Sequence, residues 1–226
     1  MMNKFEKLNN PVWHALNETH EHFGIDYGGV KFYKNNICPF GGFTDITQTK
    51  KALNNYSTLT ASFFVVGNTP NYDNTVTLNK TVVCEQMILD RYIENEYHYK
   101  IIQLSKQHVN ELYDLIWLVM PGYYQKKTFD MGDYYGIFVE NKLVAVTGER
   151  MQLDDFIEVS TVVTHPDYVR KGMAKQLVAY TTEQIISKNK VPILHVAEHN
   201  LGAIELYKKL GYTSLRKMTW RHFLRH

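Results

Sequence analysis

The feature that most constrains the fold is a strand, a short loop, a glycine and a long helix in succession over residues 156–187. The strand pattern ends at His165, and apolar residues at helical spacing then continue to about residue 187. Gly172, followed two residues later by Ala174, opens this helix. Small residues there let backbone N–H groups approach an anion, and the unpaired N–H groups of the first helical turn attract it. The segment therefore predicts a cradle for a diphosphate inside an α/β fold.

Basic side chains surround this predicted cradle. Arg170, Lys171 and Lys175 lie close together in a chain whose formal net charge is only +2. The chain has no G-x-x-x-x-G-K-[ST] sequence, so a P-loop is unsupported, and no G-x-G-x-x-G follows a first strand as a dinucleotide fold requires. The alternative is an ordinary helix start that is basic by accident.

The second half of the chain has a regular order of elements. It predicts a strand, a helix capped by Ser105, three antiparallel strands, the helix described above, a strand, a short helix capped by Asn200, and the last strands. The expected bounds are 100–104, 105–119, 135–139, 143–150, 156–164, a helix to 187, 193–197, 200–211 and 212–223. This order is typical of an α/β (α+β) sandwich built on a mixed sheet.

The first half is less regular. It predicts helices at 12–23 and 47–54 and strands at 30–33, 60–66 and 81–86. We expect a smaller α/β unit over residues 1–97, which a degenerate copy of the second fold would explain, and a second domain over residues 98–226.

Two motifs in the second half resemble those of the GNAT superfamily of acyl-CoA-dependent N-acyltransferases. Residues 169–174 are similar to the [QR]-x-x-G-x-[GA] segment that binds the CoA pyrophosphate, with Val169 in place of the first polar residue. Residues 200–212 are similar to the family's N-x-x-A-x-x-[LF]-Y-x-x-x-G-[FY] motif. The resemblance covers about residues 99–223, and the E-V-S-T-V-V-T-H-P strand is similar to that of glycine N-acyltransferase-like proteins.

The resemblance implies a mixed, mostly antiparallel sheet with flanking helices and acetyl-CoA as co-substrate. The residues that would contact acetyl-CoA are Val162, Val163, Thr164, Val169, Arg170, Lys171, Gly172, Met173, Ala174, Lys175, Asn200 and Ala203. Backbone N–H groups at Val162 or Val163, where the strand is expected to separate from its neighbour, would polarise the thioester carbonyl.

Two residues are candidates for proton transfer. The resemblance implies that Tyr207, on one helix face with Asn200, protonates the departing thiolate; otherwise it is a core tyrosine. A glutamate at the offset of Glu158 is the general base in the family's histone acetyltransferases, and its apolar neighbours would raise its pKa. Alternatively Glu158 orders the acceptor loop, and Glu149 or a water molecule accepts the proton.

Composition excludes several other classes of function. No Lys/Arg block is long enough to follow a nucleic acid, and the apolar stretches at 61–66 and 115–120 are too short for a bilayer. We expect a cytoplasmic protein, because residues 1–11 do not resemble a secretory signal, and two ordinary buried thiols, Cys38 and Cys84. No metal is expected, since His195 and His199 would be ~13 Å apart on a strand.

The expected function is transfer of an acetyl group from acetyl-CoA to a primary amine by direct attack in a ternary complex. A non-catalytic acyl-CoA sensor or partner-binding module is the alternative, and a binding function of residues 1–97 alone is a third. The acceptor, a small-molecule or peptide amine, is open, and so is the oligomeric state. The aromatic loop at 123–135 is expected either to contact the acceptor or to pack between the halves.

Overall fold

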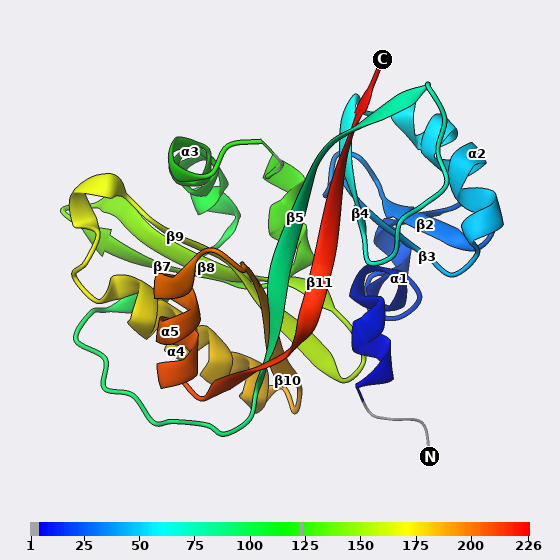
Figure 1. Ribbon diagram of the computed structural model, residues 1–226. Coiled ribbons are helices and arrows are strands. Elements are labelled where there is room, and N and C mark those ends of the chain that lie inside the picture. Colours follow the sequence, from blue (N-terminus) through cyan, green and yellow to red (C-terminus); the bar gives the residue numbers. More distant parts are fainter. Residues whose placement is uncertain (1–4, 123) are drawn as a thin grey trace.

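The structure is a computed structural model that describes residues 5–122 and 124–226, so Tyr123 of the aromatic loop lies outside the described residues. The described residues form one 11-stranded sheet in the order β1-β2-β3-β4-β11-β5-β10-β9-β8-β7-β6, with helices against it (Figure 1). The strands are β1 Gly24–Asp26, β2 Val30–Tyr33, β3 Phe40–Phe43, β4 Ser62–Val66, β5 Val76–Leu89, β6 Ile101–Gln103, β7 Tyr134–Val139, β8 Lys142–Gln152, β9 Phe156–Thr164, β10 Val191–Ala197 and β11 Tyr212–Arg225. The α-helices are α1 Pro11–Ala15, α2 Ile46–Ser57, α3 Val109–Val119, α4 Met173–Ser187 and α5 Leu201–Lys209. Within this described part, no helix has the length and apolar character that a membrane crossing needs.

The second half confirms the predicted order of elements and the mixed α/β fold. Strands β7, β8 and β9 pair antiparallel, and β10 pairs parallel to β9. Glu140 and Asn141, both with positive φ, form the tight turn between β7 and β8. Asn200 caps α5 by accepting from the N–H of Ala203 at 3.2 Å. Gly211 ends this helix region with φ +91°, and a Cβ there would lie 2.0 Å from the carbonyl oxygen of Arg91, so only glycine fits.

Strands from the two halves of the sequence are interleaved in the sheet. The long strand β5 from the first half lies between β10 and β11 and pairs antiparallel with both. β11, the last strand of the chain, also pairs with β4. Figure 1 shows β5 and β11 side by side along almost their whole length. The boundary at 97/98 therefore does not separate two sheets, and the division of the chain into two domains stays a prediction.

The first half departs from the sequence expectation in three places. The helix predicted at 12–23 ends at Ala15 and is followed by turns and a 3-10 segment, Glu21–Phe23. Strand β3 was not predicted because two of its four residues are glycines. A Cβ on Gly41 would lie 2.3 Å from the ring of Phe32, so the packing at this position requires glycine. Because glycine is uncommon inside strands, the same residue makes the segment hard to predict as a strand from the sequence. Short strand β1 was also not predicted, whereas β2, β4, α2 and the middle of β5 confirm the predictions there.

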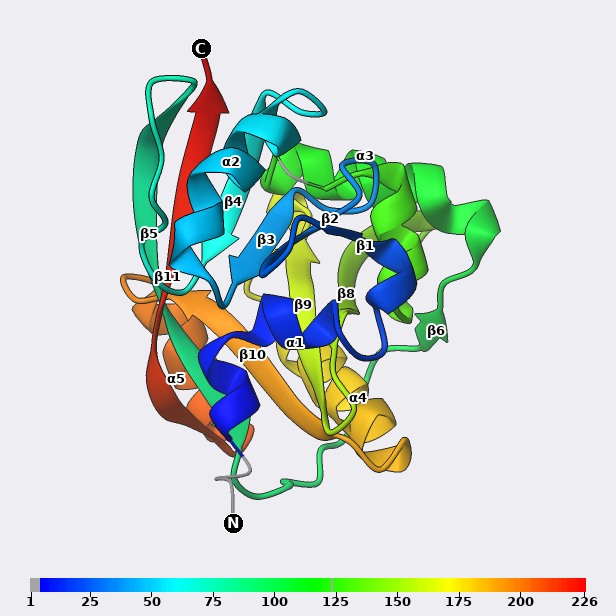
Figure 2. The ribbon, with the colours of Figure 1, turned by 90° about the vertical axis from the view of Figure 1, so that its right-hand side faces the viewer.

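Helices cover both faces of the second half of the sheet. α4 and α5 pack on one face, where Val178 and Tyr207 join the apolar cluster of β9, β10 and β5. α3 packs on the other face against β7, β8 and β9, with Leu112 and Val163 in one cluster. α1 lies against this second face further along, where Val12 and Leu16 contact the cluster that contains Trp220. Figure 2 shows α1 crossing in front of β9 and β10, opposite α4 and α5.

Candidate active site

A cavity lies between the end of β9 and the start of α4, at the place where the sequence predicts the cradle. Thr164, Leu206 and the continuous segment 168–175 line this cavity. Arg170 and Gly172 both have positive φ, +60° and +80°, so the chain makes two left-handed steps just before α4. A Cβ at Gly172 would meet nothing within 4 Å, which means that the space in front of the helix is open. Met173, Ala174 and Lys175, the first residues of α4, line this cavity. The first backbone N–H groups of a helix have no partner within the helix.

The cradle carries positive charge that no acidic side chain of the described residues neutralises by an ion pair. Among the described residues, Arg170, Lys171 and Lys175 take part in none of the ion pairs found. The ammonium of Lys171 lies 4.7 Å from the ring centroid of Tyr168, and the hydroxyl of Tyr99 donates to the Lys171 carbonyl oxygen at 3.0 Å. Helix dipole and side-chain charge therefore both favour an anionic ligand with several oxygens.

A second cavity, of about 380 Å³, lies where β9 and β10 separate. The two strands pair only from Val191 opposite Phe156 to Ile193 opposite Glu158, and beyond that point they diverge. One part of the lining comes from β9 (Val159–Val162), β10 (His195–Ala197), Asn200 and Tyr207. A second part comes from the first half of the chain and from β11: Cys38, Phe40, Phe64, Lys80, Val82, Cys84 and Trp220. The remaining lining residues are Met120, Tyr124, Thr128 and Arg150. A volume of this size is typical of a small-molecule site.

The backbone of β9 is irregular at the wall of this second cavity. Val163 pairs with Val146 and Ser160 with Gly148, so two residues of β9 oppose only Thr147 of β8. Thr161, within this bulge, has φ +55°, an unusual conformation for a β-branched residue. Such local strain is found mostly at functional sites, where a bulge redirects backbone groups. An oxyanion-binding role of the N–H of Val162 or Val163 stays a prediction.

Tyr207 reaches the second cavity from α5. Its neighbour Leu206 lines the cradle, so consecutive residues of α5 contact the two cavities. Tyr207 is 7% exposed, and burial raises the pKa of its hydroxyl to about 12. The side chain therefore keeps its proton at neutral pH and is able to donate it. Asn200 lines the same cavity while its side-chain oxygen caps α5.

Glu158 lies behind the cavity wall and not in its lining. Its carboxylate accepts from Arg150 Nε at 2.7 Å and from Arg150 Nη2 at 2.6 Å, and His195 Nδ1 lies 2.7 Å away. Complete burial alone would raise the pKa of Glu158, but the charge and hydrogen bonds of Arg150, with those of His195, lower it to about 2. The desolvation expected from its apolar neighbours is therefore present, whereas the expected rise in pKa was wrong.

His195 links this ion pair to the first half. The side-chain amide nitrogen of Gln86 donates to the carbonyl oxygen of Leu8 at 2.9 Å and lies 3.0 Å from His195 Nε2. Nε2 is then the acceptor, and the ring proton is assigned to Nδ1, where it is donated to Glu158. His195 is thus a hydrogen-bonded strand residue, as the sequence indicated.

The remaining predicted site residues do not all line the same cavity. Glu149 lines neither cavity; it binds Lys188 Nζ at 2.5 Å, and burial raises the pKa of Glu149 despite that charge. The side chain of Val163 packs with α3, and Ala203 packs beside the cluster of α4 and α5. Val162 lines the second cavity, whereas Thr164, Val169 and the other predicted residues of segment 169–175 line the cradle.

Cys38 and Cys84 are both free and buried, which confirms the interpretation as ordinary thiols. Burial raises the pKa of the Cys84 thiol to about 11 and that of Cys38 further. Neither thiol is therefore an activated nucleophile, although both line the second cavity. Across the described residues, no group of three or more His, Cys, Asp and Glu side chains is arranged to hold a metal ion.

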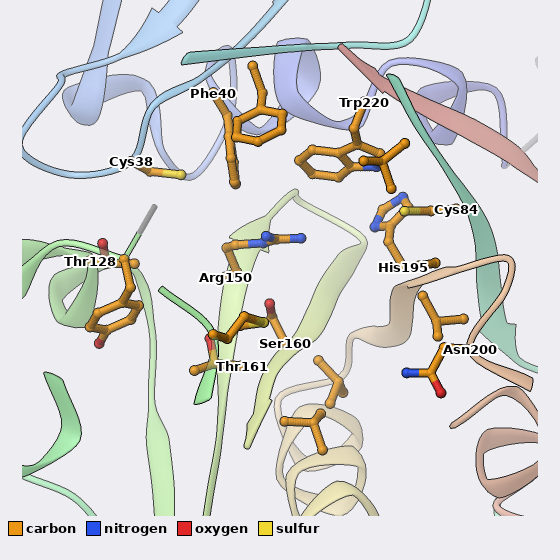
Figure 3. Close-up of a pocket in the computed structure, with 18 of the residues that line it drawn as sticks. Cys38, Phe40, Cys84, Thr128, Arg150, Ser160, Thr161, His195, Asn200 and Trp220 are labelled. Atoms are coloured by element: carbon orange, nitrogen blue, oxygen red, sulfur yellow. The ribbon is translucent and has the colours of Figure 1, made fainter. Parts of the chain in front are cut away.

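Several lining residues were not predicted from the sequence. Phe40, Phe64, Lys80 and Trp220 belong to strands or loops that local patterns do not connect with residues 156–207. Figure 3 shows Phe40 and Trp220 above the cavity and Arg150 reaching into its centre from β8. Arg150 had a sequence signal, because the three predicted antiparallel strands place its strand beside that of Glu158. Tyr124 and Thr128, which also line the cavity, belong to the aromatic loop at 123–135, which the sequence also indicated.

A sheet opened between parallel β9 and β10, with a cradle at the adjacent helix, defines the GNAT fold. Residues 134–221 match the family model described as FR47-like protein. A GNAT-family protein from Novosphingobium aromaticivorans has a TM-score of 0.90 at 25% identity, over 98% of this chain and 99% of that one. A GCN5-related N-acetyltransferase from Kribbella flavida has a TM-score of 0.65 at 14% identity, over 100% and 96%. A GCN5-related N-acetyltransferase-like protein from Streptococcus suis has a TM-score of 0.66 at 14% identity, over 95% and 93%.

The last two similarities concern the fold alone, because their identity is low. No curated protein sequence matches the chain. The family model matches 88 of the 226 residues, and with the first structural match it shows that the chain is similar to GNAT-family proteins.

Proposed function

We propose that the chain is an N-acetyltransferase that moves an acetyl group from acetyl-CoA to a primary amine. One observation carries the proposal: in each of two elements, residues that are close together in the sequence line the cradle and the second cavity. Thr164 and Val162 of β9 line the cradle and the cavity respectively, and Leu206 and Tyr207 of α5 do the same. A ligand with a diphosphate at one end and a thioester at the other fits such an arrangement.

In this proposal the diphosphate is bound by the backbone N–H groups at the start of α4. Gly172 supports the close approach because no Cβ fills the space, and Arg170, Lys171 and Lys175 supply charge. The donor set of the cradle therefore fits CoA. Val162, Val163 and Asn200 would lie along the thioester end, where β9 and β10 have separated.

When bound, acetyl-CoA supplies an activated acetyl group. The acceptor nitrogen attacks the carbonyl carbon, the C–S bond breaks, and the electron pair leaves on sulfur. A backbone N–H of β9 polarises the carbonyl oxygen, and the hydroxyl of Tyr207 protonates the thiolate. The burial of Tyr207 and its place in the cavity support this role.

For Glu158 we propose the ordering role and not that of general base. Both carboxylate oxygens already accept hydrogen bonds, and a pKa of about 2 makes the group a poor proton acceptor. Glu149 is held by Lys188 outside both cavities. The acceptor ammonium then loses its proton to water in the cavity.

The same features leave a second candidate function, a non-catalytic acyl-CoA-binding module. The engagement of Glu158 favours it, because the cavity then lacks a carboxylate base. Isothermal titration with acetyl-CoA and thiol release with a panel of amines distinguish the two. Binding with thiol release supports the transferase, binding without release from any amine supports the module, and no binding at millimolar acetyl-CoA rejects both.

The narrower resemblance to glycine N-acyltransferase-like proteins is a hypothesis about the acceptor. Its support is limited to the strand motif at 158–166. Glycine in the amine panel tests it directly, because that subgroup would acetylate or acylate glycine.

A further inference from the structure

The second cavity is unusual in the balance of charge on its walls. Two cationic side chains, Lys80 and Arg150, are part of its lining. No Asp or Glu is among the lining residues that the structure describes. An amine acceptor is an ammonium ion in water at neutral pH, so a cavity built only to receive a cation would be expected to carry acidic groups.

Arg150 presents its positive charge to the cavity and keeps its counter-ion behind it. Glu158, which it binds, is completely buried and outside the lining. The guanidinium carbon lies 5.1 Å from the ring centroid of Phe40 and 5.0 Å from that of Trp220. Aromatic rings and the ion pair therefore fix this charge in one place at the centre of the cavity (Figure 3).

Lys80 lies on β5 opposite His222 of β11, and its side chain lines the same cavity. The ring of His222 stacks on Phe64, with centroids 4.6 Å apart. Among the described residues Lys80 forms none of the ion pairs found, and it is exposed. The pKa of His222 is lowered, mainly by burial and to a smaller extent by the positive charge of Lys80.

Large apolar and aromatic side chains make up much of the remaining lining, beside the polar side chains of Thr128, Ser160, Thr161, His195 and Asn200. Phe40, Phe64, Val82, Met120 and Trp220 line the same cavity as the two cations. An acceptor that fits all walls needs an anionic group for the cations and an apolar body for the rings. Such an anionic group also offsets the repulsion between the ammonium and the cationic walls.

We propose that the acceptor is an amine that carries a carboxylate and an apolar body, as an apolar amino acid does, and that Lys80 is a specificity-determining residue that binds the carboxylate. The statement that the amine is acetylated rests on the proposed transferase function. The preference for a ligand with a carboxylate rests on the cavity lining alone.

The test compares L-phenylalanine with L-phenylalaninamide, which has nearly the same shape but no negative charge. Equilibrium binding of each is measured by titration calorimetry on the full chain, without and with CoA, and thiol release from acetyl-CoA is measured in parallel. We expect L-phenylalanine to bind about ten-fold more tightly, the effect of one hydrogen bond to a charged group. Lys80→Met should reduce this preference to within about two-fold and Lys80→Glu should reverse it. Lys51→Met, an exposed lysine of α2, is the control that should keep the preference.

The inference is overturned if L-phenylalaninamide binds equally well or better, if neither compound binds, or if Lys80→Met retains the preference. Failure of the proposed function gives a different result. Selective binding of L-phenylalanine, without thiol release from it or from any other amine of the panel, would keep the charge selection and reject the transferase. Thiol release only with amines that lack a carboxylate would keep the transferase and reject the inference.

Discussion

Replacing Glu158 by glutamine separates the two roles open to this residue, that of a general base and that of an ordering group. Glu158→Gln keeps the shape of the side chain and removes its charge. Arg150 then loses the partner that binds it through two nitrogens, and the hydrogen bond from His195 Nδ1 loses its charge. If Glu158 is an ordering group, Glu158→Gln should lower the free energy of unfolding. If it is a general base, Glu158→Gln should lower kcat.

The size of the effect follows from the pKa of Glu158. That pKa is lowered from 4.5 to about 2. A difference of roughly 2.5 pH units corresponds to about 3 kcal/mol of folding free energy. Because the residue is completely buried, solvent does not screen this value. For a chain of this size, the melting temperature should fall by about 6 to 12 °C.

The dependence on pH has a defined sign. The folded-state pKa of Glu158 is the lower one, so its contribution is complete above pH 4.5 and is lost as the pH falls from 4.5 to about 2. Urea unfolding of the unaltered chain should show this loss, and Glu158→Gln should lack it. Adding Arg150→Met to Glu158→Gln should recover part of the stability, because the unpaired buried cation is removed.

Glu205→Gln is the matched control. Glu205 is an exposed carboxylate in a surface pair with Lys208, and its replacement should change the unfolding free energy by less than about 1 kcal/mol. If Glu158→Gln unfolds with the same midpoint as the unaltered chain while kcat falls by about 100-fold, Glu158 is the base and the reasoning above is refuted.

Three further predictions concern the cradle, the proton donor and the boundary between the halves. Gly172→Ala should destabilise the chain by about 1 kcal/mol, because φ is +80°, and should weaken acetyl-CoA binding in calorimetry, since its Cβ enters the open space of the cradle. Tyr207→Phe should lower kcat by about 100-fold with the Kd for acetyl-CoA unchanged; unaltered turnover would reject the proton donor. Residues 98–226 produced alone should be unfolded by circular dichroism, because β10 and β11 both lose their partner β5, and a cooperative melt would contradict this.

Local sequence pattern predicted the elements of the second half well, because there the local and tertiary preferences agree. Strand β9 was predicted to the residue, since its alternation is bounded by His165-Pro166 on one side and by Asp154-Asp155 on the other. The helix predicted at 12–23 failed because Pro11 supplies a start signal, whereas Asn17 and Thr19 beyond Ala15 favour turns.

The candidate site was predicted as far as consecutive residues build it. Segment 164–175 and the motif at 200–207 form the cradle and one wall of the second cavity. The role of Glu158 depends instead on pairing across strands, because an apolar neighbourhood alone would raise its pKa and only Arg150 and His195 lower it. That pairing follows from a register with irregular steps, which the sequence pattern does not specify.

The interleaving of β5 and β11 explains why the sequence pattern did not predict the cavity residues that these two strands supply. Lys80 and Cys84 of β5 lie 140 and 136 residues before Trp220 of β11, yet their strands are neighbours with Trp220 opposite Val82. Gln86, on the same strand β5, also reaches His195 behind the wall. The first half therefore supplies one wall of the cavity and one partner of the buried network that holds Arg150. Changes in the first half should then alter acceptor choice through β5, while the cradle at α4, built entirely from the second half, continues to bind the same co-substrate.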